Sequence, residues 1–316
     1  MNRIDFTKKI IGLAPMAGFT DKPFRQLVKS FGCDLVYTEM ISARGVFEDY
    51  KENGFSKSLK LAEFEDAERP ILVQIFGREP KIMAEAAKII CNKFDPDGID
   101  INMGCPAPKI VKNSYGSVLM NEPELAGQIV KVVKRASGNR LVTVKTRLGW
   151  KDSKGVGDFI LTLEDAGADL IALHCRTKMQ GFSGDPDWDA VRQIKKNIKI
   201  PILVNGGIKK WQDVDKCLSA SDGDGVLIGQ ASLGRPWIFQ EIREARSITL
   251  SYDEITKICL QHVCLHRENC GNFVELKKHL LHYYKGIANC AKVREKICQC
   301  NDVKEFLSIV GTFGSQ

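Results

Sequence analysis

Hydrophobic residues in this chain gather in short continuous runs, separated by longer segments with polar faces. Continuous apolar runs are typical of parallel strands that helices cover on both faces. Between the runs, apolar positions recur with helical spacing in Pro80–Cys91, Glu122–Arg135 and Trp188–Lys196. The pattern therefore predicts eight strands, at Ile10–Ala14, Leu35–Glu39, Ile71–Gly77, Gly98–Met103, Leu141–Arg147, Leu170–Arg176, Pro201–Gly206 and Gly225–Gly229.

Eight strands that alternate with helices predict an α/β fold of the (β/α)8 TIM-barrel type. An open, doubly wound sheet is the competing fold, but its usual G-x-G-x-x-G turn is missing from Leu13–Thr20. A barrel needs roughly 250 residues, and from about Ser251 the remaining chain shows helical periodicity. We therefore expect a catalytic barrel over residues 1–245 and a small all-helical domain over 246–316.

The segment Asp100–Lys109, D-I-N-M-G-C-P-A-P-K, carries the most chemical information. It ends an apolar strand at Asn102 and places Cys105 between Gly104, which permits backbone angles closed to other residues, and Pro106, which fixes φ. The carboxyl ends of the strands form the active-site face of a TIM barrel. A core cysteine is the alternative, but it needs neither a polar neighbour nor such a turn. We therefore predict an accessible, functional thiol at Cys105.

Other predicted strands also end in polar or small residues. Lys145 and Arg147 alternate on one strand and so point to the same side, where buried cations require an anionic or electron-rich partner. His174 ends the next strand. The glycine-rich ends at Asn205–Gly207 and Gly229–Gln230 favour a phosphate site, because loops after strands 7 and 8 of such barrels often bind phosphate. Ordinary turns are the alternative for these glycines.

Composition narrows the class of protein. The net charge is +7, and residues 101–160 hold 10 Lys and Arg against 4 Asp and Glu, which suits a polyanionic partner as well as a solvated surface. The 11 cysteines lack C-x-x-C pairs, which favours reduced cytoplasmic thiols over disulfides or a metal site. We find no signal peptide and no apolar run long enough to span a membrane. We expect a monomer without a stable protein partner.

Seven segments in register resemble the tRNA-dihydrouridine synthase family, and they span nearly the whole predicted barrel. The opening A-P-M-A-G, together with N-M-G-C-P and G-R-P-W-I-F, is most similar to the bacterial B-type, nitrogen-regulation-like subgroup. No single segment would be specific, but their common order is. The segments are Leu13–Arg25, Val73–Gly77, Asp100–Lys109, Lys145–Trp150, His174–Thr177, Asn205–Ile208 and Gly229–Phe239.

The resemblance implies an FMN enzyme that uses NADPH to reduce selected tRNA uridines to 5,6-dihydrouridine. Flavin N5 would give hydride to C6, and Cys105 would give a proton to C5 as the general acid. By the same resemblance, Asn102, Arg147 and Arg176 would contact the uracil or nearby polar groups. The FMN would be lined by Pro15, Met16, Ala17, Gln74, Lys145, His174, Asn205, Gly206, Gly207, Gly229 and Gln230.

The helical tail of this family binds tRNA, and its R-K-H-x-x-W-Y pattern is similar to K-K-H-L-L-H-Y here. The resemblance implies tRNA contacts by Lys277 and Lys278, with His282, Tyr284 and Lys285 as further candidates. An amphipathic helix with a solvated basic face is the alternative. The chain also departs from the family pattern, because Gln230 replaces a common arginine, Gly207 a common aspartate and Lys277 the motif arginine.

Two other functions stay open on the residues alone. An FMN barrel acting on a small pyrimidine, as in dihydroorotate dehydrogenases, would share the phosphate site and the K-x-R strand but would not need the tail. A non-catalytic RNA-binding protein is disfavoured, because Cys105, Lys145 and His174 are all present. The sequence does not indicate which uridine is reduced, nor a preference for NADPH over NADH.

Overall fold

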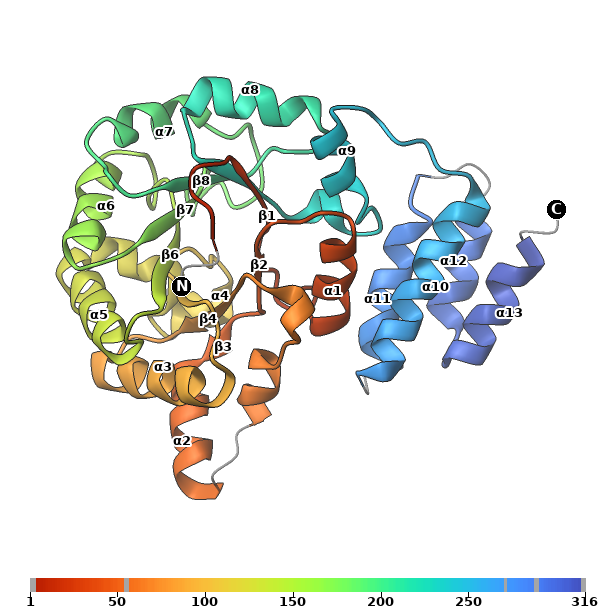
Figure 1. Cartoon of the computed structure of the whole chain (residues 1–316), viewed down its shortest axis with the longest axis horizontal. Helices are drawn as coiled ribbons and strands as arrows, with labels where there is room; N and C mark the ends of the chain where they lie inside the picture. Colours follow the sequence, from red (N-terminus) through yellow and green to blue (C-terminus); the bar gives the residue numbers. More distant parts are fainter. Residues whose placement is uncertain (1–3, 54–56, 270–271, 287–289, 314–316) are drawn as a thin grey trace.

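The computed structural model describes residues 4–53, 57–269, 272–286 and 290–313. Parallel strands form a ring in the order β1-β9-β8-β7-β6-β5-β4-β2 (Figure 1). A bridge between Gly12 of β1 and Leu35, just before β2, closes the ring, which confirms the predicted TIM barrel. The strands are β1 (Ile10–Leu13), β2 (Val36–Tyr37), β3 (Ile41–Ser42), β4 (Ile71–Phe76), β5 (Gly98–Asn102), β6 (Leu141–Arg147), β7 (Leu170–His174), β8 (Ile202–Asn205) and β9 (Gly225–Ile228).

Each of the eight predicted runs contains a strand, but the second position of the barrel is divided. Both β2 and the short β3 pair with β4. Between them the Thr38 hydroxyl accepts a hydrogen bond from the backbone N–H of Gln74 at 3.0 Å. A side chain therefore replaces a backbone acceptor at this point. The pattern of apolar residues in the sequence did not predict the short strand β3.

Helices surround the strand ring (Figure 1). Alternate strand residues enter different cores: Leu170 and Ala172 of β7 pack inside the ring, whereas Ile171 and Leu173 pack in the core shared with the helices. Burial on both faces explains the continuous apolar runs. The barrel helices are α1 (Lys22–Ser30), α2 (Ala43–Asn53), α3 (Pro80–Phe94), α4 (Pro108–Lys112), α5 (Pro123–Ala136), α6 (Val156–Asp165), α7 (Trp188–Lys195), α8 (Gln212–Ser221) and α9 (Ile238–Glu244), with 3-10 turns at Lys57–Ala62, Asp66–Glu68, Gly116–Asn121 and Gln230–Ser232.

The C-terminal helices form a bundle beside α1 and α9 (Figure 1). It consists of α10 (Tyr252–Glu268), α11 (Phe273–Tyr283), α12 (Ala291–Gln299) and α13 (Val303–Phe313). Ser251 caps α10, and its side chain and that of Glu254 bond each other's backbone N–H groups in a capping box. This agrees with the helical start expected near Ser251. No helix in the described part of the chain is long and apolar enough to cross a membrane.

The bundle and the barrel share a hydrophobic core. Leu27 of α1 and Trp237 lie in the same cluster as Leu276 and Leu280 of α11. Contact is also close at Gly234, where φ is +70° and a Cβ atom would lie 2.2 Å from the carbonyl carbon of His282. Only a glycine fits between the two backbones here, so the packing fixes the bundle next to the mouth of the barrel.

Candidate active site

A cavity of about 1270 Å³ opens at the carboxyl ends of the strands. Its polar lining follows from the alternation along each strand. On β5, β6 and β7 the residues that share the inner face end in Asn102, Arg147 and His174. The ring is therefore apolar in its middle and polar at one end, so hydrogen-bonding groups converge where the cavity begins.

A buried network lies at the base of the cavity. The amide of Gln74 donates to Asp100 at 2.7 Å and accepts from the amide of Asn102 at 2.9 Å. Asp100 also accepts from the Thr143 hydroxyl. Burial raises the pKa of Asp100 to about 6, although both hydrogen bonds oppose the rise. The chain of bonds fixes the orientation of both amides before any ligand binds.

The loop that carries Cys105 is held from three sides. The side-chain oxygen of Asn102 accepts from the backbone N–H of Cys105 at 3.0 Å. Arg147 Nε donates to the carbonyl of Gly104 at 2.8 Å, and Ser117 N–H donates to the carbonyl of Cys105 at 3.2 Å. The thiol lines the cavity and is half-buried. Its backbone is therefore fixed while its side chain stays within reach of a ligand.

Arg147 acts mainly on the protein's own backbone. It is 3% exposed, and besides Gly104 it donates to the carbonyls of Thr177 at 3.3 Å and Gly181 at 2.7 Å. Its guanidinium also lies over the Phe182 ring, 5.4 Å from the centroid. One side chain thus ties the Cys105 loop to the loop after β7.

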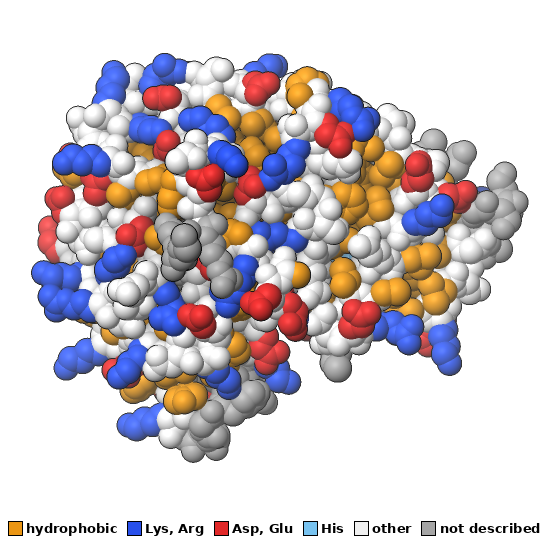
Figure 2. Space-filling view, in the orientation of Figure 1, with side chains coloured by type: hydrophobic (Ala, Val, Ile, Leu, Met, Phe, Trp, Pro, Cys, Tyr) orange, Lys and Arg blue, Asp and Glu red, His pale blue; other side chains and the backbone are white. Residues whose placement is uncertain are grey.

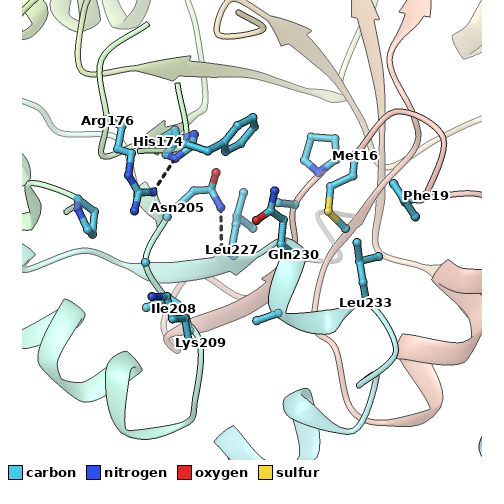
Figure 3. Close-up of a pocket in the computed structure, with 18 of the residues that line it drawn as sticks. Met16, Phe19, His174, Arg176, Asn205, Ile208, Lys209, Leu227, Gln230 and Leu233 are labelled. Atoms are coloured by element: carbon cyan, nitrogen blue, oxygen red, sulfur yellow. Dashed lines mark hydrogen bonds between the residues drawn. The ribbon is translucent and has the colours of Figure 1, made fainter. Parts of the chain in front are cut away.

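Four further polar side chains converge on the facing wall. Lys145 Nζ donates to the side-chain oxygen of Asn205 at 3.0 Å, and the amide of Asn205 donates to the carbonyl of Leu227 at 2.8 Å. Figure 3 shows Arg176 directed at His174, with Nη1 and Nε2 separated by 3.4 Å. Because arginine can only donate, the imidazole accepts at Nε2.

Burial controls the charges of this wall. Burial, together with the neighbouring charge of Arg147, lowers the pKa of Lys145 to about 8. Burial and the nearby cations lower the pKa of His174 to about 2, so its ring is neutral near pH 7. The wall therefore combines one titratable cation with a neutral imidazole, an arrangement that favours an anionic or electron-rich ligand.

The turn after β8 brings backbone close to the cavity. Gly206 and Gly207 have φ values of +105° and +86°. A Cβ atom at Gly206 would lie 2.7 Å from the His174 ring, and one at Gly207 would lie 2.4 Å from Pro186. The indole of Trp188 donates to the carbonyl of Gly206 at 3.1 Å. Glycine is required at both positions, and the turn presents backbone rather than side chains to a ligand.

Nearly all predicted site residues line this one cavity. Lys277 and Lys278 are the two that do not. The residues that the structure brings together are Pro15, Met16, Ala17, Gln74, Asn102, Cys105, Lys145, Arg147, His174, Arg176, Asn205, Gly206, Gly207, Gly229 and Gln230.

The tail contributes differently from the expectation. Lys277 donates to the carbonyls of Cys298 and Cys300 at 3.0 and 2.8 Å, so it joins α11 to the end of α12. Tyr284 is fully buried and is not available for stacking. Lys278 lies near the mouth, with Nζ over the Phe19 ring at 5.4 Å. Contacts of Lys277 and Lys278 with tRNA stay a prediction.

Several lining residues escaped sequence reasoning. Phe182 and Asp185 come from the loop after β7, Trp188 begins α7, and Tyr283 ends α11. Lys209 and Lys210 lie shortly after the glycine turn. This pair of adjacent charges next to a predicted phosphate site was the one signal that could have identified them as lining residues. On the face in Figure 2, Lys and Arg side chains are spread among acidic ones, so charge alone would not have revealed the site.

Comparison with known proteins gives the family. The model of the dihydrouridine synthase (Dus) family matches residues 12–313. A probable tRNA-dihydrouridine synthase of Aquifex aeolicus (strain VF5) is 35% identical over 96% of this chain and 96% of its own length. The tRNA-dihydrouridine synthase B of Pseudomonas syringae pv. tomato (strain ATCC BAA-871 / DC3000) is 33% identical over 94% of this chain and 90% of its own.

Solved structures match the barrel at low sequence identity. The old yellow enzyme homologue of Zymomonas mobilis superimposes with a TM-score of 0.53 at 13% identity, over 76% of this chain and 90% of its own. Morphinone reductase in complex with tetrahydroNAD also gives a TM-score of 0.53, at 11% identity over 76% and 88% of the two chains. These likenesses support the fold. The family match and the curated relatives identify the family: the chain belongs to the dihydrouridine synthase family.

Proposed function

We propose that this protein reduces uridines in tRNA to 5,6-dihydrouridine, with FMN as its bound cofactor and NADPH as the reductant. The observation that carries the proposal is that one cavity holds the Cys105 thiol, the Lys145 cation and the Gly206–Gly207 turn. Membership of the dihydrouridine synthase family supports the reaction class. The barrel of residues 1–245 would carry the chemistry, and the helices of residues 246–316 would bind the tRNA. The reaction would take place in the cytoplasm.

The lining residues suit FMN. A cavity of about 1270 Å³ exceeds the volume usual for one small ligand, so it has room for a flavin and a target base. Gln74 and Asn205 offer amides to the polar edge of the ring, and Lys145 would balance negative charge there. Pro15, Met16 and Ala17 would cover the ring. When bound, FMN supplies the hydride for C6 of uracil after reduction by NADPH.

The phosphate of FMN would lie at the glycine turn. Gly206, Gly207 and Gly229 allow backbone N–H groups to approach it closely. Gln230 brings no charge where relatives of this type often carry arginine, but Lys209 and Lys210 line the same cavity. We propose that these two lysines supply the missing positive charge.

Cys105 would protonate C5 of the uracil. A general acid must carry its proton at the moment of transfer, so a neutral thiol is the required form. Asn102 and Arg147 would set the position of this thiol through the backbone of its loop, at distances of 3.0 and 2.8 Å. Both residues would therefore position the loop, and Asn102 would also contact the base.

A tRNA substrate explains why the bundle reaches the mouth. His282, Tyr283 and Lys285 line the cavity together with strand residues. A base must leave its stack to enter such a cavity, and the bundle offers polar and cationic groups beside its path. A small pyrimidine would require none of these groups.

The test is a direct assay for dihydrouridine. Purified protein, NADPH and tRNA that lacks the modification would be incubated, and the digested tRNA analysed by mass spectrometry. We expect dihydrouridine to accumulate, and the Cys105→Ala variant to be slower by roughly 10²- to 10⁴-fold, the usual contribution of a general acid. Cys264→Ala is the matched control, because Cys264 is exposed on α10 and outside the cavity.

Other outcomes would change the function. Reduction of free uracil or oxidation of dihydroorotate, without reaction on tRNA, would favour a small-pyrimidine enzyme. Binding of tRNA without flavin and without dihydrouridine would favour a non-catalytic RNA-binding protein. Equal losses in Cys105→Ala and Cys264→Ala would contradict the assigned acid.

A further inference from the structure

A second polar cluster lies between the barrel and the bundle, and none of its three residues lines the cavity. It consists of Asp21 at the start of α1, His262 of α10 and His279 of α11, and we call it the seam cluster. One ligand atom from each residue lies within 4.8 Å of the others. The two imidazole centroids are 4.7 Å apart, with their planes at 68°. Three elements thus present metal-ligating groups to one point.

Two nitrogens of the seam cluster have no hydrogen-bond partner. His262 is 0% exposed and His279 is 1% exposed, and the Nε2 atoms of both are buried and make no hydrogen bond in the described structure, although that of His279 has an ion-pair contact with Asp21 at 3.4 Å. Buried polar atoms are nearly always bonded, so each exception requires an explanation. A ligand bound between the two rings would satisfy both atoms at once.

The remaining atoms of the cluster are oriented by the protein. His262 Nδ1 lies 3.0 Å from the hydroxyl of Tyr283, and Asp21 Oδ1 accepts from the backbone N–H of Phe24 at 3.0 Å. Ligating histidines usually use their second nitrogen in this way, which leaves the first directed at the metal. The second carboxylate oxygen of Asp21 faces His279 Nε2.

One pair of ligand atoms already has the spacing of a small divalent cation. His279 Nε2 and Asp21 Oδ2 are 3.4 Å apart. Ligand atoms of a tetrahedral zinc site, with bonds near 2.0 Å, are separated by about 3.3 Å. Two imidazoles and one carboxylate form a ligand set that zinc accepts, with water in the fourth position. The Phe19 and Phe24 rings lie 5.4 and 5.2 Å from the His279 ring and shield the point from solvent.

We propose that Asp21, His262 and His279 bind one divalent transition-metal ion of the zinc type. The ion joins α1 of the barrel to α10 and α11 of the bundle. It thereby fixes the two parts of the molecule relative to each other, at a point behind the cavity-lining residues Phe19 and Tyr283. The site stands on its own residues and does not depend on the proposed reaction.

Cobalt is the most informative probe, because its visible bands report coordination geometry. Full-length protein, freed of metal by a chelator, would be titrated with CoCl2 and then with ZnCl2. We expect one equivalent of Co²⁺ to give the intense visible bands of a tetrahedral site, and Zn²⁺ to displace it. A thiolate charge-transfer band in the near ultraviolet would instead assign the metal to cysteine and overturn the proposal.

Three variants test the ligands. His262→Gln and His279→Gln should each weaken Zn²⁺ binding by more than ~100-fold, since loss of a ligand exceeds the 10- to 100-fold effect of losing its outer partner. Asp21→Asn is the variant most certain to fold, because asparagine caps a helix as well as aspartate does. It should weaken Zn²⁺ binding at least ~10-fold. Its circular dichroism should match that of the parent.

His266→Gln is the matched control. His266 is a buried histidine of α10 but does not belong to the seam cluster, so this variant should bind Zn²⁺ as the parent does. Zinc should raise the melting temperature of the parent and of His266→Gln, and not that of His279→Gln. No binding of Co²⁺ or Zn²⁺, or binding that persists unchanged in His262→Gln and His279→Gln, would overturn the proposal.

Discussion

The cavity and the seam cluster both collect buried polar side chains, but they satisfy them differently. In the cavity, Gln74, Asn102 and Lys145 each bond to another side chain of the protein. In the seam cluster, two imidazole nitrogens have no bond. The cavity is thus preorganised before a ligand arrives, whereas the seam cluster depends on a ligand to become complete. Substitutions in the two places should therefore have different consequences, and the predictions below test this contrast.

Among the residues that hold the cavity in place, the largest effect on rate is expected at Arg147. Lysine cannot donate to the carbonyls of Gly104, Thr177 and Gly181 at once, so Arg147→Lys should release the Cys105 loop. A displacement of about 1 Å at a reacting group can cost ~100-fold in rate. We expect kcat for dihydrouridine formation to fall by that factor, measured with saturating tRNA. Arg44 is exposed and forms ion pairs with Glu48 and Glu79, so Arg44→Lys should leave kcat unchanged.

Gln74→Leu should destabilise the protein more than any single change in the seam cluster. It leaves one oxygen of Asp100 and the amide of Asn102 buried without their present partner. We expect the free energy of unfolding in urea to fall by ~3 kcal/mol. Gln193→Leu, on the exposed face of α7, should change it by less than ~0.5 kcal/mol. Equal effects of the two variants would mean that the cavity network is not preorganised.

The charge of Lys145 predicts opposite effects of pH on cofactor binding and on stability. Its pKa of about 8 means that the cation is present below pH 8 and lost above it. FMN affinity should therefore fall by about tenfold between pH 7.5 and 9.5, as measured by flavin fluorescence. Lys145→Arg should show no such decline, because arginine stays charged.

Stability of the cofactor-free protein should move the other way. The folded pKa of Lys145 lies below its ordinary value of 10.5, so the unfolded chain binds more protons between pH 8 and 10.5. The contribution of Lys145 to unfolding free energy should therefore rise across that window. This contribution is isolated by measuring unfolding free energy against pH for the parent and for Lys145→Met and taking the difference. A difference that falls as pH rises would contradict the burial of a cation here.

The smallest effect is expected in the seam cluster without metal. His279→Leu removes a nitrogen that has no hydrogen bond and only a 3.4 Å contact with the Asp21 carboxylate, so in chelator it should change unfolding free energy by about 1 kcal/mol. Added Zn²⁺ should widen the difference by stabilising the parent alone. A large cost of His279→Leu in chelator would show that the protein itself already satisfies this cluster.

Sequence reasoning succeeded where information is local. Continuous apolar runs predicted each barrel position, because strands buried on both faces require apolar residues throughout. The short β3 was missed, since two residues leave no periodicity to detect. Cys105 was identified from its glycine and proline neighbours, and it does line the cavity. The role of Lys277 was not foreseen, because its acceptors lie about twenty residues further along the chain.

By itself, the sequence determined the barrel, its polar end and the membership of a family, since these depend on residue types at fixed local spacing. Only the tertiary structure decided which groups meet. The carbonyls that bind Arg147 carry no side-chain signal, and Asp21 is separated from His262 and His279 by most of the barrel. Such contacts arise from the packing of α1 against the bundle. Side-chain identity alone cannot predict them, because distance in space is set by the fold.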